Sequence, residues 1–351
     1  MKILYAIQGT GNGHLARATE IVPLLSSMGE TKVLVSGIQG DLSLPFPVHY
    51  RLYGLSFIFG EKGGVDLWTT LCRLRPLRFF LDLIRLPVHD YDLVLCDFEP
   101  VSAWACRLKG KACTGISHQL AVVHPAAPHP ARTNFWGKLI LNHYAPVTHR
   151  YGFHFSKLDR HHFSPVIRRA IRQTSPSDMG HYTVYLPAYG DSEILSALQA
   201  FPEKNWEVFS KHCKKSYRKG NISVRPVSLE AFTVSFTSCR GILCSAGFET
   251  PAEALYMGKK LCVIPMSNQY EQACNAAFLS AMGIFVIPRL QGKYRELRNW
   301  LDTGPVIRIN YPDETILILD TILREGTTKS GKVSAMPGIL SQIRTILQRQ
   351  F

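Results

Sequence analysis

The strongest constraint on the fold is a strand–turn–helix–strand pattern at the N-terminus. Residues 2–8 form an apolar run typical of a buried strand, and the glycine-rich run 9–14 follows as a tight turn. Apolar residues then recur at helical spacing over 14–28, and residues 32–36 form a second apolar run. Strands and helices in this order predict parallel strands joined by crossover helices. We therefore expect an α/β fold with a doubly wound parallel sheet.

The alternation of strands and helices continues and changes character once. The segment 150–180 is rich in His, Arg, Ser and Pro, and its Ser-Pro pairs are turn signals. Further strand-like runs lie on both sides of it, at 91–96, 111–116, 182–187, 206–209, 241–244, 261–265 and 284–287. A chain of 351 residues is long enough for two domains. The sequence thus predicts two α/β domains in tandem, linked within 150–180.

Composition narrows the classes of protein to consider. The chain has no run of about 18 uncharged apolar residues, so we expect no transmembrane helix. It reaches its first glycines too soon for a signal peptide. The nine cysteines form no C-x-x-C pair, which favours reduced thiols in a cytoplasmic protein over disulfides or zinc. The net charge of +14 is compatible with a nucleotide diphosphate, an acidic membrane, nucleic acid, or simply a basic surface.

Residues 65–87 interleave apolar side chains with arginines. A basic amphipathic helix of this kind can lie on an anionic membrane surface. The alternative is a partly buried pair of helices broken at Pro76. The sequence alone leaves both interpretations open. It offers no helix-turn-helix or stacking-aromatic motif, so we do not expect nucleic acid as a partner.

The glycine-rich turn after the first strand lets the backbone approach a ligand. It lacks the Gly-Lys-Ser/Thr ending of a Walker A loop. A dinucleotide fingerprint needs a third glycine where His14 stands, and an acidic residue where the second strand ends Val35-Ser36-Gly37. NAD is therefore disfavoured. The remaining readings are a sugar or phosphate cleft lined by Gly11, Asn12, Gly13 and His14, or a structural turn beside an uninvolved histidine.

The most informative stretch is a second strand–helix–strand unit. Its first strand ends at Ser245-Ala246-Gly247, and a helix follows with Pro251 in its first turn and Gly258 at its end. The next strand leads through 266–270 into a further helix over 271–282. Ligands bind such sheets at the carboxyl ends of the strands. Backbone amides after Gly247 are therefore placed to face a diphosphate.

Carboxylates and amides gather at the same edge. Glu249 and Glu253 are four residues apart and should share a helix face, where a carboxylate can accept both hydroxyls of a ribose. Gln269, Glu271 and Gln272 follow the next strand and suit sugar hydroxyls. The alternative is that Glu249 and Glu271 are only first-turn acids favoured by the helix dipole. That alternative explains single residues better than the whole cluster.

Three motifs in order, S-x-G-x-x-T-x-x-E-A-L, G-K-x-L-x-x-I-P and E-Q-x-x-N-A, carry a family resemblance. They resemble the donor site of glycosyltransferases with the GT-B fold, in which two Rossmann-like domains face a cleft. The chain is similar to the lipid-linked N-acetylglucosaminyltransferase of peptidoglycan synthesis, to the UDP-glycosyltransferases, and to a poorly characterised microbial branch with G-F-E-T-P-A-E-A-L and Q-Y-E-Q. The N-terminal G-T-G-N-G-H matches the same superfamily, so the resemblance spans most of the chain.

The resemblance implies a role for each matching donor residue. Glu253 matches the carboxylate that binds the donor ribose, and Gly247 and Thr250 match positions near the diphosphate. Glu271 and Gln272 match the pair that reads the donor sugar, with Gln269 beside them. The chain departs from the pattern at Glu271, where Asp is common, and it lacks the W-x-P-Q box of the plant enzymes. The identity of the sugar therefore stays open.

On the acceptor side, His14 matches the family's histidine, and Asp97 matches the aspartate that pairs with it. The resemblance implies an inverting, metal-independent transfer from a UDP-sugar, with His14 as general base and Asp97 orienting it. The resemblance is to metal-independent enzymes, and the histidines of 121–150 fit no standard metal spacing, so we expect neither metal nor cofactor. His118 is either an acceptor-side residue or a solvated loop histidine.

The resemblance also implies an organisation. We expect an acceptor-binding domain over 1–165, a donor-binding domain over 176–335, and a last helix, 337–350, that crosses back onto the first domain. The expected acceptor is lipid-linked or a glycan, as in cell-envelope polysaccharide or glycolipid synthesis, and residues 65–87 suggest a peripheral position on the inner face of the membrane. A nucleotide-sugar 2-epimerase and a non-catalytic nucleotide-sugar-binding subunit remain as alternatives.

Overall fold

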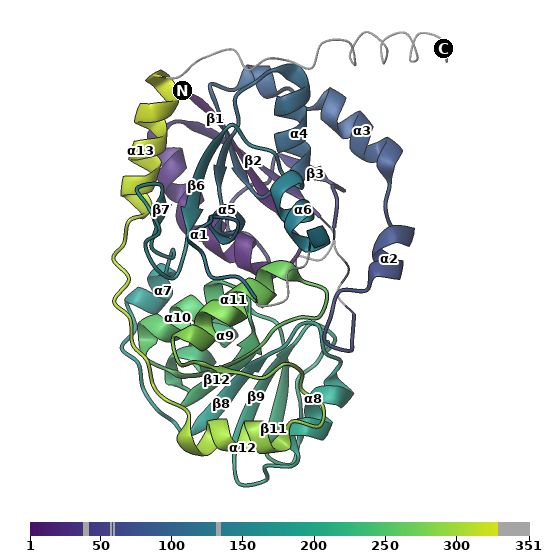
Figure 1. The fold of residues 1–351 in the computed structure, drawn as a ribbon, viewed down its shortest axis with the longest axis vertical. Coiled ribbons are helices and arrows are strands. Elements are labelled where there is room, and N and C mark those ends of the chain that lie inside the picture. The colour runs from purple at the N-terminus through teal and green to yellow at the C-terminus, as the bar shows by residue number, and fades with distance from the viewer. Residues whose placement is uncertain (38–41, 57, 59, 131–134, 329–351) are drawn as a thin grey trace.

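The computed structural model describes residues 1–37, 42–56, 58, 60–130 and 135–328. Within them the chain forms two seven-stranded sheets, stacked end to end in Figure 1. The first has the order β3-β2-β1-β4-β5-β6-β7. It comprises β1 (Lys2–Gln8), β2 (Glu30–Ser36), β3 (Tyr50–Leu52), β4 (Leu93–Asp97), β5 (Thr114–Ile116), β6 (His149–Phe153) and β7 (His162–Phe163).

The second sheet has the order β10-β11-β9-β8-β12-β13-β14. Neighbouring strands run parallel in both sheets, except for the antiparallel edge pair β10 and β11. This sheet comprises β8 (His181–Tyr185), β9 (Asn205–Ser210), β10 (Tyr217–Lys219), β11 (Ile222–Pro226), β12 (Gly241–Ser245), β13 (Lys260–Ile264) and β14 (Phe285–Val286). The predicted α/β fold with two Rossmann-like units is confirmed.

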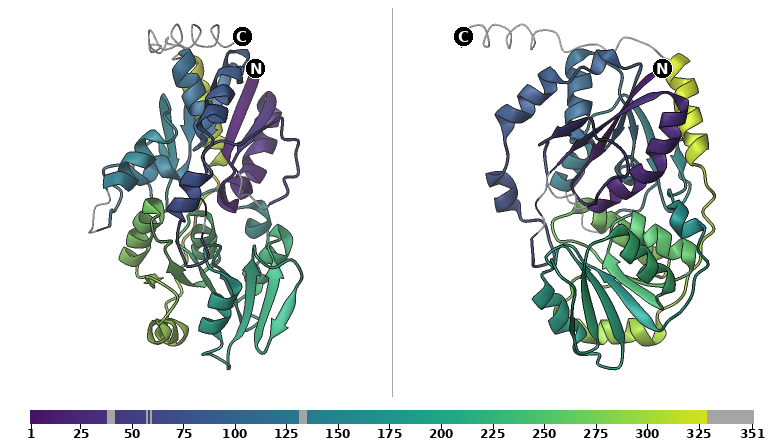
Figure 2. Two further views of the ribbon diagram at one scale, coloured as in Figure 1. Left: turned by 90° about the vertical axis from the view of Figure 1, so that its right-hand side faces the viewer. Right: turned by 180° about the vertical axis from the view of Figure 1, so that it is seen from behind.

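Helices cover the faces of both sheets, as Figure 2 shows from two further sides. Those of the first half are α1 (Asn12–Met28), α2 (Leu67–Cys72), α3 (Pro76–Arg85), η1 (Val88–Asp90), α4 (Pro100–Lys109), α5 (His118–Val122) and α6 (Phe135–His143). Those that follow are α7 (Arg169–Arg172), α8 (Asp191–Leu198), α9 (Leu229–Ser238), α10 (Glu249–Met257), α11 (Tyr270–Ala281), α12 (Tyr294–Thr303) and α13 (Thr315–Thr328).

The passage between the two sheets is shorter than the composition of 150–180 suggests. β6 and β7 lie within that segment but pair with the first sheet, so the chain leaves it only after Phe163. It then forms the short helix α7 and enters the second sheet at His181. The histidine-rich part of the segment is therefore structured sheet edge rather than linker.

The chain crosses back once more near its end. Helix α13 packs on α1, where Ile318, Leu319 and Ile322 join a buried core with Leu15. The Tyr151 hydroxyl, on β6, donates a 2.7 Å hydrogen bond to Glu325 of α13. Figure 1 shows yellow α13 beside purple α1, although the second sheet lies between them in sequence. The returning helix predicted at 337–350 lies outside the described residues, and α13 makes the return that the structure describes.

Residues 65–87 form the two helices α2 and α3, with Pro76 as the first residue of α3. Only Leu83 of α3 is buried, and α3 packs along α4. Much of the apolar surface of these helices is instead exposed, including Trp68 at 75% and Leu77 at 81%. Among the described helices, none combines the length and the apolar character needed to cross a membrane.

Candidate active site

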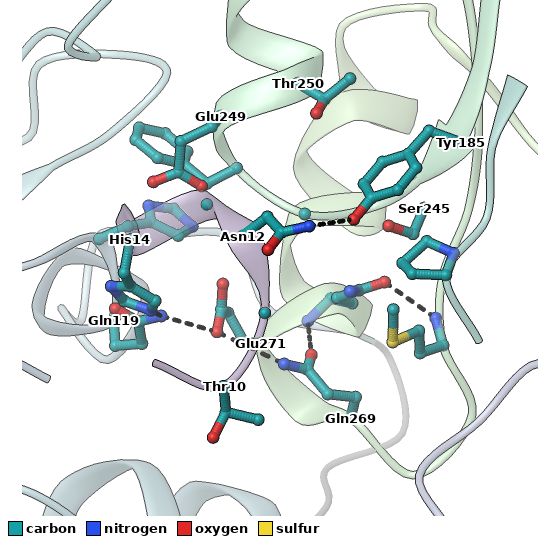
Figure 3. Close-up of a pocket in the computed structure, with 18 of the residues that line it drawn as sticks. Thr10, Asn12, His14, Gln119, Tyr185, Ser245, Glu249, Thr250, Gln269 and Glu271 are labelled. Carbon is teal, nitrogen blue, oxygen red and sulfur yellow. Dashed lines mark hydrogen bonds between the residues drawn. The ribbon is translucent and has the colours of Figure 1, made fainter. Parts of the chain in front are cut away.

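A pocket of about 830 Å³ lies where the carboxyl ends of the two sheets face each other. It brings together all the residues predicted for the site except Asp97 and Glu253. Figure 3 shows the side chains from both halves pointing into it. Its lining consists of Thr10, Gly11, Asn12, Gly13, His14, His118, Gln119, Tyr185, Pro187, Lys211, Ser245, Gly247, Phe248, Glu249, Thr250, Met266, Gln269, Glu271 and Gln272.

His14 and Asp97 are in hydrogen-bond contact at the wall of the pocket. β1 and β4 are adjacent parallel strands, so the turn after β1 and the end of β4 meet at one edge of the sheet. His14 Nδ1 lies 2.8 Å from Asp97 Oδ1, and the carboxylate is fully buried behind the ring. Burial alone would lower the pKa of His14, but the charge and hydrogen bond of Asp97 outweigh it and raise the pKa above 6.5.

Arg17 is a site residue that the sequence-based prediction misses. Its Nε and Nη2 donate to the two Asp97 oxygens at 3.1 and 2.5 Å, and its Nη1 donates to Glu249 across the cleft. Burial would raise the pKa of Asp97, but Arg17 and His14 hold it below its usual value. The sequence feature that could have identified Arg17 is its position, because it lies on the buried face of an apolar helix, three residues after His14.

Glu271 lies opposite His14, in the first turn of α11. Its carboxylate accepts hydrogen bonds from Gln119 Nε2 at 2.9 Å and Gln269 Nε2 at 3.5 Å, and burial raises its pKa. Gln119 Nε2 also lies 3.2 Å from His14 Nε2, while its Oε1 is buried without a partner among the described residues. The Gln272 side chain instead stabilises the loop before its own helix, because its Oε1 accepts a 3.0 Å hydrogen bond from Met266 N. Gln119 and Glu271 thus present polar atoms beside the histidine.

Glu249 and Glu253 share a helix face, as the helical spacing predicts, and both line an adjoining pocket of about 480 Å³. Glu249 also lines the main pocket, whereas Glu253 does not. Both Glu253 oxygens accept 2.6 Å hydrogen bonds from Arg168, which leaves the carboxylate 3% exposed. Tyr185 and Phe232 also line this second pocket. The two carboxylates therefore differ in their tertiary partners, which the local sequence pattern does not show.

His118 is buried rather than solvated, so that alternative is wrong. Its ring stacks on Phe248 with 3.8 Å between centroids and is 1% exposed. Nδ1 lies 2.9 Å from the Phe153 carbonyl, and Nε2 lies 2.7 Å from Asn275 Oδ1 on α11. Burial lowers its pKa to about 4. His118 therefore touches the pocket while joining the two halves of the molecule.

One group of described residues, His124, Asp159 and His162, lies close enough for its ligand atoms to hold a metal ion. Their hydrogen bonds favour a hydrogen-bonded cluster around the Asp159 carboxylate over metal coordination. His124 Nδ1 accepts from Ala126 N at 3.2 Å, so its proton sits on Nε2, 3.3 Å from Asp159. His162 Nδ1 lies 2.6 Å from the other Asp159 oxygen. The Asp159 carboxylate thus already has an imidazole nitrogen beside each of its oxygens. A zinc-bound histidine donates its second N–H, whereas His124 accepts a hydrogen bond there.

The comparisons with known proteins agree with this geometry. The family model described as Glycosyl transferase family 1 matches residues 1–305. The chain belongs to this family. No curated protein matches its sequence. Among solved structures it is similar to MurG of Acinetobacter baumannii, with 15% identity, coverage of 92% of this chain and 99% of that one, and a TM-score of 0.53.

Two further solved structures show the same fold. The glycosyltransferase SnogD of Streptomyces nogalater has 12% identity, coverage of 93% and 95%, and a TM-score of 0.51. The spinosyn rhamnosyltransferase SpnG, complexed with thymidine diphosphate, has 13% identity, coverage of 99% and 100%, and a TM-score of 0.51. The protein is a glycosyltransferase with the GT-B fold.

Proposed function

We propose that this glycosyltransferase transfers a sugar from a UDP-sugar to a hydroxyl group of a lipid-linked or glycan acceptor. The transfer inverts the anomeric configuration and needs neither a metal ion nor a cofactor. In this proposal, residues 1–165 bind the acceptor and residues 176–335 bind the donor. The observation that carries it is the contact of His14 with the buried Asp97 at the wall of a pocket shared by both halves.

The chemistry follows from that contact. When Nδ1 donates its proton to Asp97, Nε2 is the unprotonated nitrogen that can remove a proton from the acceptor hydroxyl. The acceptor oxygen attacks the anomeric carbon from the face opposite the diphosphate. The bond from that carbon to the phosphate oxygen breaks, and its electron pair leaves with UDP. Backbone amides near Gly11–Gly13 and Gly247 stabilise the charge on the leaving diphosphate.

The donor would span both pockets. Tyr185 and Phe232 suit a nucleobase in the second pocket, where Glu253 borders the ribose. Glu271 would accept hydrogen bonds from hydroxyls of the sugar in the main pocket. Since Arg168 already occupies both Glu253 oxygens, ribose binding would use their remaining lone pairs.

Titration calorimetry tests the donor assignment. UDP, dTDP and their sugar conjugates are compared, because SpnG is solved with thymidine diphosphate. We expect Glu271→Gln to weaken binding of the nucleotide sugar while leaving the free nucleotide unchanged. Glu296→Gln removes another first-turn acid, on α12, and is the matched control. Absence of any nucleotide binding would overturn the donor assignment, and equal weakening of nucleotide and nucleotide sugar would overturn the role of Glu271.

Turnover tests the base. His14→Ala should reduce the rate by about 10²–10⁴-fold while nucleotide binding persists. NMR of the product should show an inverted anomeric configuration, and EDTA should not change the rate. Unchanged turnover in His14→Ala would overturn the assignment of His14 as the general base. A product with retained anomeric configuration would overturn the single-displacement mechanism.

The surface of α2 and α3 favours a membrane-bound acceptor. Trp68, Leu71 and Leu77 are 75%, 61% and 81% exposed, with arginines between them. Exposed apolar side chains among arginines suit an anionic lipid surface. The protein should co-sediment with vesicles containing phosphatidylglycerol but not with phosphatidylcholine alone. Trp68→Ser with Leu77→Ser should abolish this, and Val234→Ser, at a 65% exposed site on α9, should not. Equal sedimentation of all three proteins would contradict the assignment.

A further inference from the structure

One ion pair joins the two halves of the molecule directly at the pocket. Arg17 of α1 donates through Nη1 to Glu249, the first residue of α10. The arginine is 2% exposed, and the glutamate side chain is 21% exposed. The other two donor atoms of Arg17 hold Asp97, so the arginine connects the His14–Asp97 pair to the opposite half. Figure 3 shows the Glu249 carboxylate turned toward the start of α1.

The carboxylate occupies a space that only glycine leaves open. A Cβ atom added at Gly13 would lie 2.5 Å from Glu249 Oε2. Any side chain at this position would therefore force the Oε2 end of the carboxylate to move, while Oε1, which accepts from Arg17, would lie 3.7 Å from the added atom. The anion thus rests against bare backbone on one side and a buried guanidinium on the other. Together, Gly13 and Arg17 form an anion site, and a side chain of the protein fills it.

This site lies where the two pockets meet. Gly13 and Glu249 line both of them, together with Asn12, Tyr185 and Thr250. A donor with its nucleoside in the second pocket and its sugar in the main pocket places its diphosphate at this junction. A carboxylate and a diphosphate cannot share it without strong repulsion, since both are anions. Either the donor avoids the junction or Glu249 leaves it.

We infer that Arg17 Nη1 and the Gly13 backbone form a phosphate subsite of the donor, and that the Glu249 carboxylate fills this subsite when no donor is bound. The inference rests on the proposed function, because it takes the ligand to be a diphosphate. Donor binding exchanges the carboxylate for a phosphate oxygen, and Arg17 keeps an anionic partner throughout. The exchange also breaks the direct ion pair between Arg17 and Glu249, which we call the latch, while the hydrogen bonds of His118 to Asn275 and of Gln119 to Glu271 still join the two halves.

Calorimetric titration with inorganic pyrophosphate and with UDP tests the inference. Glu249→Gln removes the competing charge and keeps the size of the side chain. We expect its dissociation constants for both ligands to fall by about tenfold or more relative to the unmodified protein, which corresponds to about 1.4 kcal/mol. Glu230→Gln is the control, because it removes an exposed first-turn acid of α9 in the same half. Its dissociation constants should not change.

The outcomes separate this inference from the proposed function. Unchanged or weaker pyrophosphate binding by Glu249→Gln would overturn the latch, and so would a failure of both proteins to bind pyrophosphate. Tighter pyrophosphate binding by Glu249→Gln, with no preference for UDP over pyrophosphate in either protein, would support the subsite and overturn the nucleotide donor. Glu249→Ala, checked for folding by circular dichroism, repeats the test with the whole carboxylate removed and should show the same tightening.

Discussion

Replacing Asp97 with Asn should move the pKa of His14 from above its ordinary value to below it. Burial lowers this pKa, and only the charge and hydrogen bond of Asp97, helped by Glu249, overcome the burial. Arg17 lowers it as well, because a cation beside an imidazole disfavours the imidazolium. In Asp97→Asn, burial and Arg17 remain while the main opposing carboxylate is gone. The direction of the shift therefore reverses.

The effect follows from the 2.8 Å contact. Removing an opposite charge at such a distance takes away the main interaction that favours the imidazolium, so the pKa of His14 should fall. The variant should also lose stability, because removing one partner of a buried ion pair typically costs about 3–5 kcal/mol. Arg17 retains Glu249 as a partner, so we expect a loss near the lower end of that range.

The pH dependence of stability should change sign with the pKa. In the unmodified protein His14 has a raised pKa, so its contribution to the stability of the fold is complete below pH 6.5. That contribution is lost as the pH rises through the pKa of His14 in the folded protein. The lowered pKa of Asp97 gives a contribution that is present above 3.8 and lost as the pH falls through the folded value. In Asp97→Asn, His14 should instead stabilise the fold above pH 6.5 and less so in acid.

NMR titration of the histidine Cε1–H signals measures the pKa of His14 without any substrate. Comparison with His14→Gln assigns the signal, and circular dichroism confirms that Asp97→Asn is folded at the temperature used. The control is Asp90→Asn, which removes an exposed carboxylate from the same half. A folded Asp97→Asn protein whose His14 still titrates at or above pH 6.5 would refute the electrostatic argument and, with it, the role of Asp97 as the group that tunes the base.

Three further predictions concern stability, and urea unfolding measures each of them. Arg168→Met leaves the 3% exposed Glu253 without its ion partner and should cost about 3–5 kcal/mol, whereas a loss below 1 kcal/mol would show that the pair is dispensable. Gly258→Ala should cost about 1–2 kcal/mol, because Gly258 ends α10 at a φ of 64°, and no loss would mean that the turn relaxes. Because burial lowers the pKa of His118 to about 4, stability should fall by about 3 kcal/mol between pH 6.5 and 4, and His118→Phe should show a correspondingly flatter profile.

The central strands of both sheets could be predicted from the sequence because they are buried on both faces. β1, β4, β12 and β13 read as uninterrupted apolar runs, and their burial is nearly continuous. Of the four edge strands, only β14 falls within a predicted run, 284–287, and the other three could not be predicted in the same way. β3, β7 and β10 have only two or three residues each, and β10 is exposed throughout, so no periodic pattern can develop. Their pairing depends on the neighbouring strand rather than on their own residues.

The pocket shows the same division between local and tertiary information. The position of His14 follows from a turn and a helix start that the sequence displays openly. What the carboxylates do depends on two arginines distant in sequence, since Glu249 meets Arg17 and Glu253 meets Arg168. Helical spacing places both glutamates on one face but gives no sign of these partners. Arg17 is detectable only as a charge on an apolar helix face, and such a charge, if buried, needs a carboxylate partner. A buried-face arginine close to a histidine is therefore the sequence feature to search for in related chains.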